Sequence, residues 1–196
     1  MRLPDPLPGS LNLGCGRFPE PGFLNVDVDT AVGAQVFMDL SDLASYGVFP
    51  ADHFELARMS HSLEHLRDVF GVMRALHRIL KPGGRLEIQV PHFSRGITHP
   101  QHEHGFDVTF PEYFKPSFAG YVGVPFELVS MRLDYMIRFD LKEPLIKPWQ
   151  IAVLRRVNTV VTNLANLQPY VCSRFWCYWV GGFEQIEYVF RKPAAP

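Results

Sequence analysis

A glycine turn and two later aspartates are the first residues that could do chemistry together. Leu11-Asn12-Leu13-Gly14-Cys15-Gly16 indicates a short strand that runs directly into a tight turn, where the backbone can approach a ligand because glycine has no side chain to block it. Asp27 and Asp39 each follow a further apolar run, so we expect each at the carboxyl end of a strand. There Asp27 would accept hydrogen bonds from both hydroxyls of a ribose, and Asp39 one from an adenine amino group. We expect these three features to meet on one ligand.

Histidines supply the candidates for acid–base chemistry. A neutral histidine can accept a proton near pH 7. We favour His61 and His92, because each comes soon after a predicted strand and would lie near the crevice at the strand ends. His65 would lie in the first turn of a helix, where a structural hydrogen bond is the better interpretation. For each histidine, an ordinary packing or surface role remains the alternative.

The run His-Pro-Gln-His-Glu-His raises the alternative of a metal site. His99, His102 and His104 offer three ring nitrogens, and Glu103 adds a carboxylate. Zinc sites usually draw their ligands from separate elements, and the sequence shows no distant partner. We therefore predict no metal ion and interpret the segment as part of a lid over a second substrate. The aromatic residues assigned to this lid are Phe93, Phe106, Phe110, Tyr113 and Phe114.

The elements that must position these residues follow from the hydrophobic pattern. Apolar residues between Leu66 and Leu80 recur every three or four positions, which predicts an amphipathic helix. Lys81-Pro82-Gly83-Gly84 should end that helix. Because the predicted strands alternate with helices or loops, we expect a mostly parallel sheet. The strands are predicted over 11–13, 23–27, 35–38, 54–59 and 86–90.

The second half of the chain is richer in proline, aromatic residues and histidine. Thr109-Phe110-Pro111-Glu112 is typical of a capping box that starts a short helix. A strand is expected over 127–135, a helix over about 151–164 and a last strand over 185–190. No linker or repeat indicates a second domain, so we predict one domain over 1–196.

Several segments together resemble the class I S-adenosylmethionine-dependent methyltransferases, in particular their small, type-11-like members. LNLGCG is similar to the first motif of that family, NVDVD to its ribose motif and MDL to its adenine motif. MSHSLEHL and RILKPGGRLEIQVP resemble the stretch around the fourth and fifth strands. THPQHEHGFDVTFPEYF resembles the segment after the fifth strand in some members. The similarity covers residues 10 to about 118.

The resemblance implies a Rossmann-like, doubly wound α/β fold with a seven-stranded sheet in the order 3-2-1-4-5-7-6. Its last strand, at 185–190, would be antiparallel. The implied cofactor is S-adenosylmethionine, and the implied activity is methyl transfer to a small molecule, through oxygen or nitrogen. Residues 1–91 would form the cofactor-binding half, and 92–196 the acceptor-side half with the lid. The implied cofactor-binding residues are Gly14, Cys15, Gly16, Ser60 and His61 at the methionine part, Asp27 at the ribose, and Asp39 with Leu40 at the adenine.

The chain departs from the family pattern at the first turn. It reads GCGRF, so the third glycine is missing, and Pro19 and Pro21 discourage a first helix. We expect a shortened loop over 17–22 and a cofactor pocket that is open at this edge or completed by another subunit. This departure motivates an alternative function, a catalytically silent binding subunit that supports a partner enzyme. A nicotinamide-dependent dehydrogenase is disfavoured, because it needs G-x-G-x-x-G at the start of a helix to hold a pyrophosphate.

Composition and charge limit the class of protein. The 196 residues are 47% hydrophobic and 20% charged, which is ordinary for one soluble domain. Nineteen Lys and Arg nearly balance twenty Asp and Glu without a basic run, which disfavours a nucleic-acid partner. MRLPDPLPG lacks the apolar core of a signal peptide, and Arg155 and Arg156 interrupt the last long apolar stretch. We therefore expect no membrane span and a cytoplasmic location, while a homo-oligomer stays open.

Overall fold

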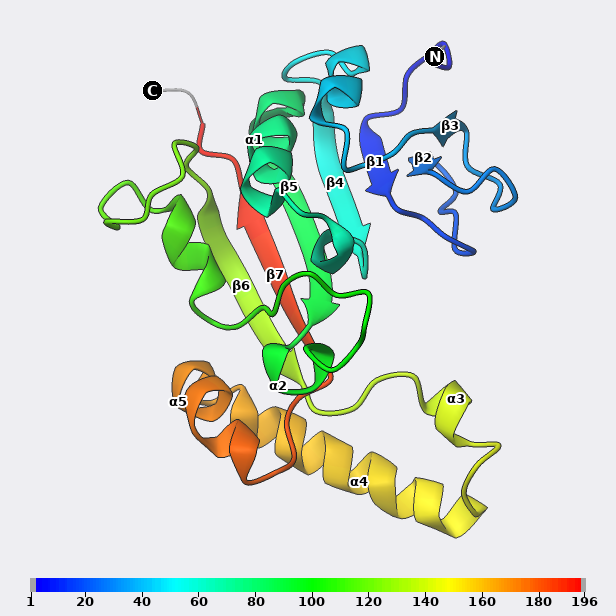
Figure 1. The fold of residues 1–196 in the computed structure, drawn as a ribbon, viewed down its shortest axis with the longest axis vertical. Helices are drawn as coiled ribbons and strands as arrows, with labels where there is room; N and C mark the ends of the chain where they lie inside the picture. Colours follow the sequence, from blue (N-terminus) through cyan, green and yellow to red (C-terminus); the bar gives the residue numbers. More distant parts are fainter. Residues whose placement is uncertain (1–2, 195–196) are drawn as a thin grey trace.

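The fold is built on one seven-stranded sheet, seen in a computed structural model that describes residues 3–194 (Figure 1). The strand order is β3-β2-β1-β4-β5-β7-β6, and β7 alone runs antiparallel to its neighbours. The predicted α/β class, the strand order and the antiparallel last strand are confirmed. The strands are β1 (Ser10–Leu13), β2 (Leu24–Asp27), β3 (Val36–Phe37), β4 (Phe54–Ser60), β5 (Leu80–Pro91), β6 (Glu127–Asp134) and β7 (Gln185–Arg191).

Five α-helices and four short 3-10 helices connect the strands within the described residues. The α-helices are α1 (Val69–Ile79), α2 (Phe93–Gly96), α3 (Phe139–Lys142), α4 (Pro148–Ala165) and α5 (Pro169–Arg174). The 3-10 helices are η1 (Leu43–Val48), η2 (Leu63–His65), η3 (Phe110–Phe114) and η4 (Trp176–Tyr178).

The amphipathic helix α1 begins later than its apolar periodicity predicts. The Asp68 carboxylate accepts a hydrogen bond of 2.7 Å from the Gly71 N–H and so caps the helix at Val69. The Lys81–Gly84 segment does end the helix, but it already belongs to β5, which starts at Leu80. The pairing of β4 with β5 is irregular between Phe54 and Leu56 at this point. The strand thus takes up the residues that the sequence pattern assigned to the end of the helix.

The predicted capping box at Thr109 does not form. The Thr109 hydroxyl donates to the Asp107 carboxylate at 2.5 Å, and the Thr109 N–H donates to the same oxygen at 2.8 Å. The hydroxyl is therefore not available to cap the next turn, and the segment that follows is the 3-10 helix η3. A local side-chain hydrogen bond has displaced the expected cap.

The first two crossovers of the sheet contain no helix in the part of the chain that the structure describes. The chain passes from β1 to β2 and from β2 to β3 through turns alone, so the predicted shortened loop over 17–22 is confirmed. Successive residues of a strand face opposite sides of a sheet. Over 57–60 of β4 and 86–89 of β5 one set is fully buried, as in Met59 and Ile88, whereas the alternate set is polar. One face of the sheet therefore carries the core, and the other is polar and partly open.

Helix α4 lies across the end of β6 (Figure 1) and is fixed there by side chains. Asn158, Thr162 and Asn166 accept hydrogen bonds from backbone N–H groups at the end of β6 and just after it. The other side of α4 exposes apolar side chains to solvent. These are Trp149, Val153, Val157, Val160 and Leu164. Among residues 3–194, no helix combines the length and the apolar character that crossing a membrane requires.

Candidate active site

The glycine turn after β1 has the backbone conformation that its sequence predicts. Gly14 and Gly16 have φ angles of +70° and +50°, where other residues are strained. A side-chain carbon at Gly14 would lie 2.1 Å from Ser62 Oγ, so the neighbouring chain itself requires glycine there. A carbon at Gly16 would meet nothing within 4 Å. Gly16 therefore presents bare backbone to open space.

Asp27 lies against this turn. Its carboxylate accepts hydrogen bonds from the Gly16 N–H at 2.7 Å and from the Asp29 N–H at 2.9 Å. A carboxylate has about four lone-pair positions, so about two remain for a ligand. The adjacent Cys15 is buried, and burial together with the Asp27 charge raises the pKa of its thiol. Cys15 is therefore a neutral thiol whose backbone, rather than its sulfur, belongs to the turn.

Leu40 borders the turn from a third segment, whereas Asp39 points into its own loop. Leu40 is buried, and its Cδ1 lies 3.6 Å from the position that a side-chain carbon of Gly14 would take. Asp39 is exposed, and its carboxylate accepts hydrogen bonds from the hydroxyl and the N–H of Ser41, which hold its pKa below the usual value. The structure thus brings Gly14 and Leu40 together, whereas the Asp39 carboxylate is engaged by Ser41.

Ser60 and His61 follow at the carboxyl end of β4. Ser60 Oγ donates to Gln89 Oε1 at 3.0 Å. His61 Nε2 lies 2.8 Å from Gln185 Oε1, and its Nδ1 lies 3.5 Å from a Glu64 oxygen. Burial lowers the pKa of His61, but the nearby Glu64 carboxylate, with help from Gln185, outweighs this effect, so the pKa is raised overall. A proton is thus easily held on this ring.

A cleft of about 960 Å³ runs from the glycine turn to the carboxyl end of β4. Gly14, Cys15, Gly16, Ser60 and His61 line it, whereas Asp27, Asp39 and Leu40 lie outside its lining. Sequence reasoning missed the polar residues of its floor, although the alternation of Glu87 and Gln89 with apolar neighbours in β5 signals an uncovered face. The further lining residues are Asn12, Arg17, Phe18, Glu20, Arg58, Glu87, Gln89, Ile137, Arg138, Asp140, Gln185 and Glu187.

Arg58 is the charged centre of the cleft floor. Its guanidinium pairs with Glu20 on the shortened loop and with Glu87 on β5, the latter at 2.7 Å. These pairs tie the loop over 17–22 to the sheet at the place where the first helix is missing.

His92, the second predicted base, does not reach the cleft. The ring is fully buried, with Nδ1 2.7 Å from Ser94 Oγ and Nε2 2.8 Å from Ser173 Oγ. Burial lowers its pKa to about 4, so the ring is neutral at pH 7. Both nitrogens are occupied and no solvent reaches them. This geometry argues against the predicted catalytic role of His92 and favours a structural one.

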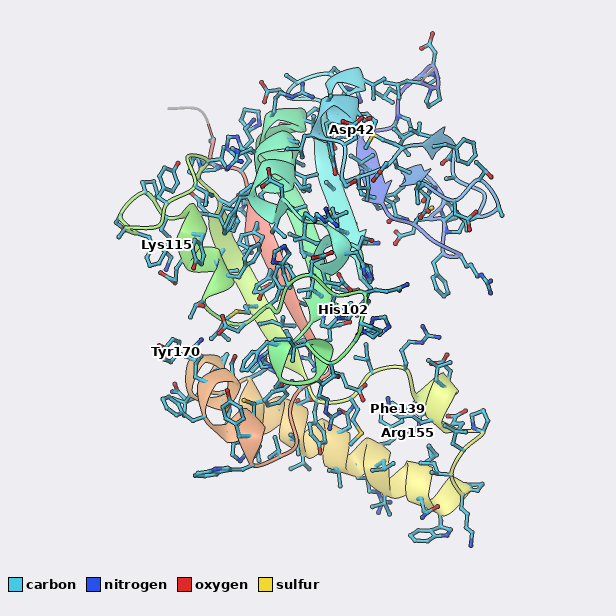
Figure 2. The ribbon with its side chains drawn as sticks, viewed as in Figure 1. Asp42, His102, Lys115, Phe139, Arg155 and Tyr170 are labelled. Atoms are coloured by element: carbon cyan, nitrogen blue, oxygen red, sulfur yellow. The ribbon has the colours of Figure 1, made fainter. Side chains whose placement is uncertain are left out.

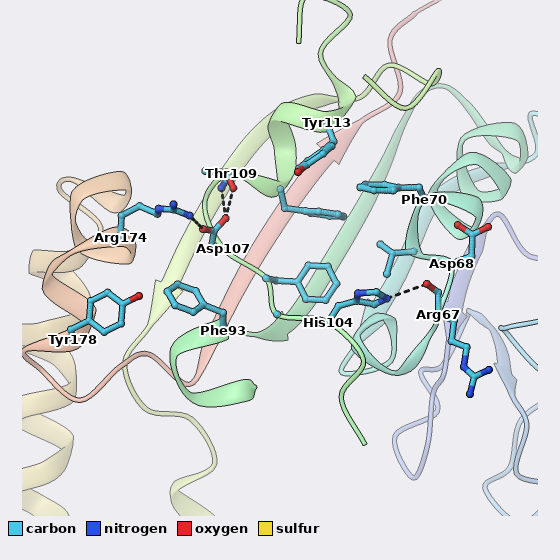
Figure 3. A pocket seen from close by; sticks show the side chains of 14 residues that line it. Arg67, Asp68, Phe70, Phe93, His104, Asp107, Thr109, Tyr113, Arg174 and Tyr178 are labelled. Atoms are coloured by element: carbon cyan, nitrogen blue, oxygen red, sulfur yellow. Dashed lines mark hydrogen bonds and ion pairs between the residues drawn. The ribbon is translucent and has the colours of Figure 1, made fainter. Parts of the chain in front are cut away.

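A second cavity of about 540 Å³ lies beside α1 and η3 (Figure 3). Four aromatic residues of the predicted lid line it, whereas Phe114 is buried in the core. In Figure 3, Arg174 reaches from α5 toward Asp107, with which it forms an ion pair. His104 lies at another wall, with its Nε2 3.1 Å from the Arg67 carbonyl. The aromatic residues that line the cavity are Phe70, Phe93, Phe106, Phe110, Tyr113 and Tyr178, of which the sequence analysis missed Phe70 and Tyr178.

The protein family follows from a comparison with family models. A model described as a methyltransferase domain matches residues 20–118, which is half of the chain. The chain belongs to this methyltransferase family. S-adenosylmethionine is the cofactor of this family, and the resemblance noted in the sequence is confirmed.

Solved structures of several proteins share the fold of this chain at low sequence identity. An S-adenosylmethionine-dependent methyltransferase from Archaeoglobus fulgidus is 15% identical, with a TM-score of 0.56 over 93% of this chain and 85% of that one. One from Mesorhizobium loti is 14% identical, with a TM-score of 0.52 over 94% and 91% of the two chains. Phosphoethanolamine N-methyltransferase 2 from Haemonchus contortus, in complex with S-adenosylhomocysteine, is 15% identical, with a TM-score of 0.54 over 94% and 49%. No curated protein sequence matches the chain.

The residues of the glycine turn fit the cofactor of the methyltransferase. The bare backbone of Gly16 leaves room for a ligand, and the Asp27 carboxylate beside it keeps lone pairs that the hydroxyls of a ribose can use. S-adenosylmethionine carries no phosphate, so the missing helix N-terminus after the turn removes no required contact.

Proposed function

We propose that the chain is an active S-adenosylmethionine-dependent methyltransferase that methylates a small molecule at oxygen or nitrogen. The observation that carries the proposal is the contact between the Gly16 N–H and the Asp27 carboxylate beside the open cleft. It supports a cofactor-binding site made of Gly14, Cys15, Gly16, Ser60 and His61 at the methionine part and Asp27 at the ribose. Asp39 and Leu40 would hold the adenine.

The main task of the protein in this reaction is to align the nucleophile with the methyl group and the sulfur. When bound, S-adenosylmethionine supplies a methyl group on a sulfonium, which a nucleophile displaces in line. Holding two reactants in that geometry can contribute about 7–11 kcal/mol. The glycine turn and Asp27 would fix one reactant, and His61 would take the proton that an oxygen or nitrogen acceptor loses. His61 lines the cleft, which supports this role.

The aromatic cavity is the proposed site for the acceptor. Its apolar walls and the Arg174–Asp107 pair give the mixture of apolar surface and few polar groups that small-molecule sites usually have. The balanced charge of the chain supports a small molecule rather than a nucleic acid, and a cytoplasmic location is part of the proposal.

A binding subunit without catalysis is the second candidate. The first two crossovers lack helices, and the exposed apolar side of α4 supports contact with a further chain. A homo-oligomer would use a second copy to cover α4. Analytical ultracentrifugation tests that arrangement, and sedimentation as a monomer at all concentrations would contradict it.

Turnover separates the two candidates. The purified protein is incubated with methyl-labelled S-adenosylmethionine and a small-molecule cell extract, and S-adenosylhomocysteine and labelled products are measured by mass spectrometry. An enzyme releases S-adenosylhomocysteine together with one methylated product. Cofactor binding without any release, across extracts of varied origin, would contradict the enzyme and support the binding subunit.

A further inference from the structure

Glu64 is buried without a hydrogen bond to its carboxylate and has only long contacts to basic groups. Its side chain is 1% exposed. Among residues 3–194, its two carboxylate oxygens are the only buried side-chain nitrogen or oxygen atoms that have no hydrogen bond. The nearest basic atoms, His61 Nδ1 at 3.5 Å and His65 Nε2 at 4.0 Å, stay beyond good hydrogen-bond geometry. A buried carboxylate that lacks hydrogen bonds is costly, and the long contact with His61 compensates it only in part, so this position favours a closer cation.

Two histidines next to Glu64 are oriented by backbone carbonyls. His65 Nδ1 lies 3.0 Å from the Gln101 carbonyl, and His102 Nδ1 lies 2.7 Å from the Gly96 carbonyl. A carbonyl oxygen only accepts, so Nδ1 carries the proton in both rings and Nε2 keeps its lone pair. Metal-binding histidines are held in this way, with the second ring nitrogen donating to a carbonyl or carboxylate.

The three side chains converge from two separate segments. One ligand atom each from Glu64, His65 and His102 lie within 4.8 Å of one another. Glu64 and His65 belong to η2, whereas His102, labelled in Figure 2, comes from the loop after α2. The Glu103 N–H donates to the Glu64 carbonyl at 2.9 Å and ties the two segments together. The site is therefore held in place by backbone contacts that need no ion.

We propose that Glu64, His65 and His102 bind a divalent transition-metal ion, with zinc as the first candidate. Two imidazole nitrogens and one carboxylate are a donor set that zinc and its neighbours accept. Ligand atoms around a tetrahedral zinc lie about 3.4 Å apart, so small rotations of the two solvent-accessible histidines would close the site. Three protein ligands leave one position open.

This site differs from the one that the His-Pro-Gln-His-Glu-His run suggests. Of that run only His102 takes part. His99 stacks on the His102 ring with centroids 4.4 Å apart, and His104 contacts the Arg67 carbonyl. His99 and His104 therefore provide matched controls from the same segment.

The open position gives the ion a role that rests on the proposed function. His61 lines the cleft and contacts Glu64, so the ion would lie beside the cleft. There it would bind the oxygen or nitrogen of the acceptor and lower its pKa, which makes it a better nucleophile.

Metal binding can be measured without any activity. The full chain is treated with a chelator, dialysed, and titrated with Zn²⁺ by calorimetry and with Co²⁺ by visible absorption. We expect one ion per chain in the parent, in His99→Gln and in His104→Gln. His102→Gln and Glu64→Gln should bind roughly tenfold more weakly or worse, the scale on which a lost ligand acts. Zn²⁺ should raise the melting temperature of the parent more than that of Glu64→Gln, because only the parent keeps all three ligands.

Two results would overturn the site. One is a parent that binds neither ion at concentrations up to about 1 mM. The other is unchanged binding in His102→Gln and Glu64→Gln, or a loss confined to the His99 and His104 variants. Binding of S-adenosylhomocysteine and turnover are measured on the same chelated sample. Full turnover there would overturn the role of the ion, whereas absent cofactor binding with intact Zn²⁺ binding would instead contradict the proposed function.

Discussion

Asp27 is the residue whose charge matters most for the proposed cofactor site. We predict that Asp27→Ala weakens S-adenosylhomocysteine about ten- to a hundredfold, because it removes a hydrogen bond to a charged group, about 1.5–3 kcal/mol, and releases the Gly16 N–H. Asp29→Ala is the matched control, since the Asp29 carboxylate accepts only from Ala31. Calorimetry with a larger loss at Asp29 than at Asp27 would move the ribose contact by two residues.

His61 carries the proposed proton transfer. We predict that His61→Ala lowers the turnover rate about a hundredfold or more, while the affinity for S-adenosylhomocysteine stays within a few-fold of the parent. His53→Ala is the control, because His53 contacts the Pro8 carbonyl outside the cleft. Normal turnover in His61→Ala would mean that another group, or the acceptor itself, provides the base. A loss of affinity with normal turnover would leave His61 with a role in cofactor binding alone.

His92 should make the stability of the fold depend on pH. Its folded pKa is about 4, against about 6.5 in the unfolded chain, so between these values the unfolded state binds more protons. The free energy of unfolding therefore falls as the pH drops from 6.5 to 4, by up to about 3 kcal/mol from this group. The Ser94 and Ser173 hydroxyls contact the ring, and the Asp107 charge partly opposes the effect of burial.

The His92 effect is measured by urea unfolding at pH 7 and pH 5 in the parent and in His92→Gln, whose amide can still contact the serines. We expect the variant to lose less stability than the parent between the two values. Equal losses in the two proteins would show that His92 is protonated in the folded state or accessible to water.

For single residues, the sequence predicts positions that depend on neighbouring residues and misses those that depend on contacts with distant parts of the chain. The glycine turn and Asp27 could be predicted because strand ends and turns are local features. The burial of His92 depends on Ser173, which lies 81 residues along the chain. The approach of Glu64 to His102 likewise depends on a loop that folds back onto η2.

Among the elements of the fold, the turn after β1 packs directly against the turn after β4 at Gly14 and Ser62. We predict that Gly14→Ala costs about 1–3 kcal/mol of unfolding free energy, because its new carbon would lie 2.1 Å from Ser62 Oγ. Gly16 also has a positive φ, but a side-chain carbon there would meet open space. Gly16→Ala should therefore lower the free energy of unfolding by the backbone strain alone, about 1 kcal/mol. Urea unfolding measures both. Ser62→Gly should reduce the cost of Gly14→Ala, and equal costs at Gly14 and Gly16 would contradict this packing.

Periodicity predicts the elements well where it is strong, as in α1, α4 and the strands of the first half. It fails where a side chain competes with the backbone. The Thr109 hydroxyl donates a hydrogen bond to Asp107, which prevents the capping box. The Asp68 cap makes α1 begin at Val69, although the apolar pattern already begins at Leu66. The prolines of the shortened loop were a reliable signal, since they exclude a helix by geometry rather than by preference.

At the scale of the whole molecule, the sheet has a core face and a polar face. The missing first helix leaves the polar face open, and the cleft follows it from the glycine turn to β7. The sequence predicted the short loop but not the residues of this floor, because strand pairing across the sheet decides which polar side chains meet. Arg58, Glu20 and Glu87 come from three segments that only the fold brings together.

We propose that this open cleft and the glycine turn together hold S-adenosylmethionine. A crystal structure of the chain with S-adenosylhomocysteine would test the proposal. We expect the ribose hydroxyls within hydrogen-bond distance of the Asp27 carboxylate, the methionine part against Gly14–Gly16, and the sulfur directed toward His61. Ligand density in the aromatic cavity or elsewhere, with the glycine turn empty at saturating ligand, would contradict the account.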